Sequence, residues 1–95
     1  MTLTIVAQIT AKPGHEALIR SELEKLVPVT RQEAGCIQYD LHIDTSAPGS
    51  FLFFENWESR EHWQAHTKAA HLLRYRDATD GAVAGIVVHE MTKIA

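Results

Sequence analysis

The hydrophobic pattern changes its period along the chain, and the order of these periods limits the folds that the chain can adopt. Residues 3–11 alternate between apolar and polar side chains, which is typical of a β-strand. From His15 the apolar residues recur every three or four positions, as on an amphipathic helix of about five turns. Lys12-Pro13-Gly14 separates the two segments and predicts a turn, because proline interrupts the hydrogen bonding of a strand and glycine frees the backbone.

Two residues should shape the last part of this first helix. Pro28 removes one backbone hydrogen bond of the helix, so we expect a kink there. Gly35 is well placed to adopt the left-handed conformation that closes a helix.

The rest of the chain predicts three more strands and a second helix in two pieces. The strands are expected at Cys36–Asp44, Phe51–Glu58 and Ile86–Met91. Ser59 can cap a short helix that runs through Thr67, and a second helical piece is expected at Lys68–Asp77. The order β-α-β-β-α-β indicates an α+β fold of the ferredoxin-like type, with an antiparallel sheet and helices on one face. We expect residues 1–95 to form a single domain.

The third predicted strand carries large apolar side chains on both of its sides. Successive side chains of Phe51-Leu52-Phe53-Phe54 point to opposite faces of the sheet. One face of the sheet should therefore be apolar and not covered by the chain's own helices. The residues expected on this face are Val6, Leu52, Phe54, Ile86 and Val88. Because an exposed apolar patch of this kind usually marks an interface, we expect two sheets to pack face to face in a homodimer.

Charge and composition disfavour several classes of protein. The formal net charge is −3 and the lysines and arginines are scattered, which disfavours nucleic-acid binding. The first apolar segment ends at Lys12 and has no positive residue before it, so neither a signal peptide nor a membrane span is expected. Cys36 is the only cysteine, which fits a cytoplasmic protein.

Four short motifs keep their order and spacing along the chain. They are Lys12-Pro13-Gly14, residues 33–39, residues 53–57, and the pair His66 and His71. Together, from about Val6 to Met91, they resemble the antibiotic-biosynthesis-monooxygenase family, and in particular its small bacterial quinol monooxygenases. The resemblance implies a dimeric α+β barrel with a pocket between the sheet and the helices of each subunit.

The same resemblance implies a range of activities. Several members oxidise quinols or anthrone-like aromatics with molecular oxygen and without a metal or a flavin. Others isomerise a phosphorylated signalling sugar or cleave haem. Haem-cleaving relatives use an asparagine in the first strand, whereas the only asparagine of this chain is Asn56, so haem cleavage is disfavoured.

His66 is the candidate catalytic residue, because the resemblance places it in the pocket. A neutral imidazole can take a proton from a phenolic hydroxyl, so His66 would act as a base or stabilise an anion. The alternative is a histidine that only stabilises the carbonyl end of its helix. His62, His66 and His71 also suggest a metal site, but the chain lacks a His-Glu-x-x-His pattern, and we expect packed or solvated histidines and no metal.

Glu55 is expected on the same face of its strand as Phe53 and Trp57, where an unpaired carboxylate is costly. It is either a structural group paired with Arg31 or a histidine, or a carboxylate that orients His66 or binds the substrate. The other candidate substrate-binding residues are Tyr39, Phe53, Trp57, His71 and Tyr75. Aromatic side chains of this kind can equally well belong to the core.

Three functions are compatible with these residues. The first is a cofactor-independent monooxygenase that acts on a small aromatic substrate and molecular oxygen, since no phosphate-binding or Cys-x-x-Cys motif is present. The second is an isomerase of a small phosphorylated sugar, which would need cations such as Arg31, Lys25 or Arg74 near the pocket. The third is a non-catalytic, stress-related module that binds a small ligand.

Overall fold

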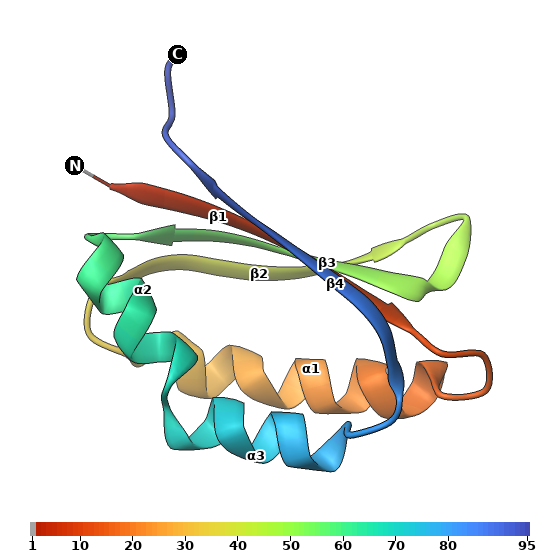
Figure 1. Ribbon diagram of the computed structural model, residues 1–95. Helices are drawn as coiled ribbons and strands as arrows, with labels where there is room; N and C mark the ends of the chain where they lie inside the picture. The colour runs from red at the N-terminus through yellow and green to blue at the C-terminus, as the bar shows by residue number, and fades with distance from the viewer. Residues whose placement is uncertain (1) are drawn as a thin grey trace.

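The computed structural model describes residues 2–95 and contains four strands and three helices. In chain order they are β1 (Leu3–Ala11), α1 (Glu16–Thr30), β2 (Cys36–Asp44), β3 (Ala47–Trp57), α2 (Arg60–Thr67), α3 (Ala70–Ala78) and β4 (Val83–Met91). The strands form one antiparallel sheet in the order β2-β3-β1-β4, and the helices lie on one face of it (Figure 1). The predicted ferredoxin-like arrangement is therefore confirmed, with the second helix divided between α2 and α3.

The end of α1 differs from the prediction. The helix continues through Pro28, as predicted, but it already ends at Thr30, with Arg31 as its C-cap. Tight turns then follow, in which the N–H groups of Gln32 and Glu33 bond to the carbonyls of Val29 and Thr30. Gly35 has the predicted left-handed conformation, with φ of 81°, but it lies in the turn that leads into β2 and does not cap α1.

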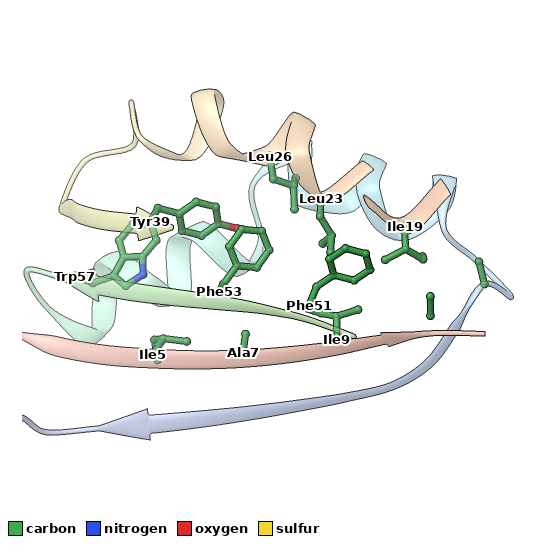
Figure 2. Close-up of a cluster of buried hydrophobic side chains, with 12 residues drawn as sticks. Ile5, Ala7, Ile9, Ile19, Leu23, Leu26, Tyr39, Phe51, Phe53 and Trp57 are labelled. Atoms are coloured by element: carbon green, nitrogen blue, oxygen red, sulfur yellow. The ribbon is translucent and has the colours of Figure 1, made fainter. Parts of the chain in front are cut away.

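The hydrophobic core fills the space between α1 and the sheet (Figure 2). Ile19, Leu23 and Leu26 of α1 are buried, as their spacing predicts. They face buried side chains from three strands, which are Ile5, Ala7, Ile9, Tyr39, Phe51, Phe53 and Trp57. Among the described residues, no helix is long and apolar enough to cross a membrane.

The pairing of β1 with β4 changes which residues lie on the outer face of the sheet, the face opposite the helices. Val88 lies opposite Ala7 and Ile86 lies opposite Ile9, and residues directly opposite each other share a face. Ile86 and Val88 therefore face the helix side of the sheet, and their predicted place beside Val6, Leu52 and Phe54 is wrong. Since Ile86-Val87-Val88 is apolar throughout, its pattern could not indicate which face each residue takes.

The helices cover β4 incompletely. Ile86 is 62% exposed and Val88 is 44% exposed, although both point to the same side as the buried core of β1. Beneath this part of the sheet the interior is accessible, and the candidate site lies there.

Candidate functional site

A cavity of about 110 Å³ lies between the sheet and the helices, with lining residues from all seven elements. Ile86 and Val88, the partly exposed residues of β4, form part of its wall. Most of the other lining residues are apolar, and the polar side chains among them include Tyr39, Glu55, His66, Thr67, Tyr75 and Arg76. A mainly apolar cavity with a few polar groups is typical of a site for a small organic ligand.

Local structure fixes His66 in the last turn of α2. Ser59 caps the helix by accepting a hydrogen bond from the backbone N–H of His62 at 3.2 Å, as predicted. The His66 side chain then packs between aromatic rings, with its ring centroid 4.8 Å from that of Trp57 and 5.4 Å from that of Tyr39. His66 is only 4% exposed and lines the cavity.

Glu33, in the turn between α1 and β2, accepts a hydrogen bond from His66. Its Oε2 atom lies 2.6 Å from Nδ1 of His66. Because an ionised carboxylate can only accept, a neutral His66 carries its proton on Nδ1 and has a free lone pair on Nε2. The sequence placed Glu33 within a family motif, but sequence reasoning did not identify it as a site residue.

Burial lowers the pKa of His66 below its ordinary value of 6.5, and the hydrogen bond and charge of Glu33 oppose this shift. Burial therefore favours the neutral form of the imidazole. Its unprotonated Nε2 can accept a proton from a ligand.

His71 supports Glu33 from α3. Its Nε2 atom lies 3.0 Å from the same Oε2 atom and 3.2 Å from the hydroxyl of Thr30. His71 does not line the cavity, so the structure places this predicted substrate-binding residue behind His66. The one sequence signal for Thr30 was its position as a polar residue in the apolar stripe of α1.

The cluster also bears on the metal question. The ligand atoms of Glu33, His66 and His71 lie within 4.8 Å of one another, and three such donors can hold a divalent cation. His62, which the sequence grouped with the other histidines, instead has its Nδ1 atom 2.7 Å from the Ser59 hydroxyl.

Glu55 is buried in β3, with a partner that the sequence did not predict. Its Oε1 atom accepts a hydrogen bond from Nε1 of Trp57 at 2.9 Å. The suggested partner Arg31 instead donates to the carbonyl of Tyr39 and to Asp40, each at 3.2 Å, and Glu33 is the carboxylate that orients His66. Burial raises the pKa of Glu55 from 4.5 to about 7, against the opposing effect of the Trp57 hydrogen bond.

The remaining predicted residues divide between the cavity and the core. Tyr39, Phe53 and Tyr75 line the cavity, and the rings of Tyr39 and Phe53 stack with centroids 4.5 Å apart. Burial raises the pKa of Tyr39, so its hydroxyl stays protonated. Trp57 is fully buried and does not line the cavity.

The cations suggested for a phosphorylated ligand do not gather at the cavity. Lys25 pairs with Glu22 at 2.7 Å on α1, and neither Lys25, Arg31 nor Arg74 lines the cavity. Arg76 is the one lysine or arginine in its described lining.

Comparisons of the sequence and of the structure with known proteins agree on one family. The model for "Antibiotic biosynthesis monooxygenase" matches residues 2–78. "Probable quinol monooxygenase YgiN" of Escherichia coli is 33% identical over 91 residues, covering 85% of this chain and 88% of that protein. The crystal structure of PA3566 from Pseudomonas aeruginosa superposes with a TM-score of 0.95 at 34% identity, covering 99% of this chain and 95% of that chain. A crystal structure of an antibiotic biosynthesis monooxygenase has a TM-score of 0.91 at 30% identity, covering 98% of this chain and 99% of that chain. The protein therefore belongs to the antibiotic biosynthesis monooxygenase family.

Proposed function

We propose that this protein is a cofactor-independent monooxygenase of the cytoplasm that oxidises a small quinol- or anthrone-like aromatic with molecular oxygen. The observation that carries the proposal is the buried, neutral His66, which Glu33 holds in one tautomer at the wall of an aromatic-lined cavity. The name of the Escherichia coli relative supports the same class of substrate.

His66 is the proposed base in this reaction. Its Nε2 atom takes a proton from a substrate hydroxyl, or from the acidic carbon of an anthrone, and the resulting anion is rich enough in electrons to reduce oxygen. One oxygen atom then enters the product, and the other leaves as water with two hydrogens of the substrate. The protonated hydroxyl of Tyr39 and the apolar walls stabilise the anion in a site from which most water is excluded.

Oxygen uptake tests this proposal directly. Chelator-treated protein is supplied with 1,4-benzohydroquinone, 1,4-naphthohydroquinone or anthrone, and the rate is compared with the uncatalysed rate. At least one compound should be oxidised faster, and His66→Ala should remove the difference, whereas His15→Ala changes an exposed histidine and should not. Thermal stabilisation by these compounds without turnover would instead indicate a binding module.

We also propose that the protein is a homodimer joined through the outer face of the sheet. Val6, Leu52, Phe54 and Val87 lie on this face, and Phe54 is 36% and Val87 50% exposed. The polar side chains beside them already bond to one another: Thr4 donates to Asn56 at 2.7 Å, and Asn56 donates to Gln38 at 2.8 Å. A second sheet can therefore cover this face without leaving those groups unsatisfied.

Light scattering after size exclusion tests the dimer. Phe54→Lys would place two like charges near each other across a two-fold interface, so the variant should be a monomer at concentrations where the unmodified protein is a dimer. Leu73→Lys, at a half-exposed apolar residue of α3, is the matched control and should remain a dimer. An unmodified protein that is monomeric at low micromolar concentration would contradict this assembly.

A further inference from the structure

One oxygen of the Glu55 carboxyl group has no side-chain partner among the residues that the structure describes. Glu55 is 3% exposed, and its Oε1 atom accepts from Trp57. Within residues 2–95, no side chain hydrogen-bonds to the Oε2 atom of Glu55. Every side-chain oxygen or nitrogen that is fully shielded in this range has a partner, so Oε2 itself is not fully shielded. Because Glu55 lines the cavity, its Oε2 atom is reached from the cavity.

In the described part of the chain, no cation pairs with this carboxyl group. The titratable and charged groups that approach it or share its cavity are Cys36 and Tyr39 of β2, Glu33 of the turn after α1, His66 of α2, and Tyr75 and Arg76 of α3. Among these groups, the negative charge of Glu33 acts on Glu55 and raises the pKa of Glu55 further. The residue opposite Glu55 on β1 is Ile5, which has no charge. A buried carboxyl in these surroundings favours its protonated form.

A protonated Glu55 carries an O–H group that needs an acceptor. Trp57 cannot be that acceptor, because an indole N–H only donates. The unmet donor faces an apolar cavity, where an oxygen atom of a bound ligand would complete the hydrogen bonding.

We infer that Glu55 recognises the ligand by donating a hydrogen bond from its protonated carboxyl to a carbonyl or phenolate oxygen. The inference deepens the proposed function and rests on the same cavity. It assigns two separate tasks: His66 removes a proton from the substrate, and Glu55 holds an oxygen that gains negative charge.

Two ligands with the same skeleton test this recognition. 1-Tetralone carries a carbonyl, tetralin lacks it, and neither titrates, so that any dependence on pH comes from the protein. Dissociation constants are measured by calorimetry at pH 6.5 and pH 8.5, a range in which burial favours the neutral form of His66. Tetralone should bind about fivefold more weakly at the higher pH, the size expected for one hydrogen bond, and tetralin should not change.

Matched variants assign the effect to Glu55. The amide of Glu55→Gln donates at both pH values, so the affinity of this variant for tetralone should not depend on pH. Glu58→Gln changes an exposed glutamate just after β3 and should behave like the unmodified protein. Tetralone binding that follows tetralin binding at both pH values, or a pH dependence that persists in Glu55→Gln, would overturn the inference.

Infrared spectroscopy gives a second measurement that needs no ligand. The carbonyl band of a protonated buried carboxyl should disappear as the pH rises through about 7 and should be absent from Glu55→Gln. A band that titrates near the ordinary glutamate pKa of about 4.3 would also overturn the inference. Neither measurement involves oxygen, so failure of the proposed oxidation and failure of this recognition can be told apart.

Discussion

The Oε2 atom of Glu33 lies 2.6 Å from Nδ1 of His66 and joins the turn after α1 to the last turn of α2. His71 of α3 donates to the same oxygen at 3.0 Å, so three separate parts of the helical layer meet at one carboxylate. The tautomer and the basicity of the proposed base therefore depend on a residue that does not line the cavity.

Replacing Glu33 with glutamine should weaken His66 as a base. The negative charge of Glu33 raises the pKa of His66, so without it that pKa falls further and the acid limb of the rate profile moves to lower pH. We expect kcat/KM to fall about 10- to 100-fold, the loss that is typical when the carboxylate orienting a metal-ligating histidine is removed. Glu24→Gln, on the exposed side of α1, is the control, and an unchanged limb in Glu33→Gln would contradict this role.

Glu55 should make the folding stability depend on pH in an unusual direction. Its pKa is 4.5 when unfolded and about 7 when folded, so the folded state binds the proton more tightly. This stability is fully present below about pH 4.5 and is lost as the pH rises through about 7, by about 3 kcal/mol at most. Urea unfolding at fixed protein concentration should therefore show Glu55→Gln becoming more stable relative to the unmodified protein between pH 5 and pH 8.5. A constant difference between the two proteins would be inconsistent with the raised pKa.

Two glycines provide a matched test of how the turn before β2 supports α2. Gly14 and Gly35 both have positive φ, of 87° and 81°. An added Cβ at Gly14 meets nothing within 4 Å, but one at Gly35 would overlap the side chain of His62 in α2. Gly14→Ala should cost about 1 kcal/mol from the backbone alone, and Gly35→Ala about 1–3 kcal/mol more from the clash. Equal losses in thermal or urea unfolding would show that this packing is unimportant.

The fold could be predicted from the sequence because its periods are clear. Alternation in residues 3–11 and 36–44 matches β1 and β2, and the stripe that contains Ile19 and Leu23 is the buried side of α1. Strand register could not be predicted, because a shift by one residue exchanges the two faces. β4 begins at Val83 and its pairing is irregular between Thr10 and Ala11, which no local pattern indicates.

The candidate site was only partly predictable. His66 was identified through the family resemblance, and the structure places it at the cavity. The sequence suggests Glu55 as its hydrogen-bond partner, because a carboxylate on an apolar strand is conspicuous. Glu33 lies 33 positions from His66 in a turn with no periodic pattern, and only the tertiary packing of α2 against that turn brings them together.

The pH dependence of oxygen uptake by the unmodified protein and by His66→Ala tests the central claim most directly. With a quinol that the protein oxidises, kcat/KM should rise with pH through an apparent pKa below 6.5 that belongs to His66. Above pH 7 it should fall by about fivefold to a plateau, as Glu55 ionises and its hydrogen bond to the substrate is lost. His66→Ala should lose the rising limb, and its plateau should fall about 10²- to 10⁴-fold, the usual contribution of a general base. A variant that keeps the full rate, or that keeps the same limb, would contradict the assignment of His66 as the base.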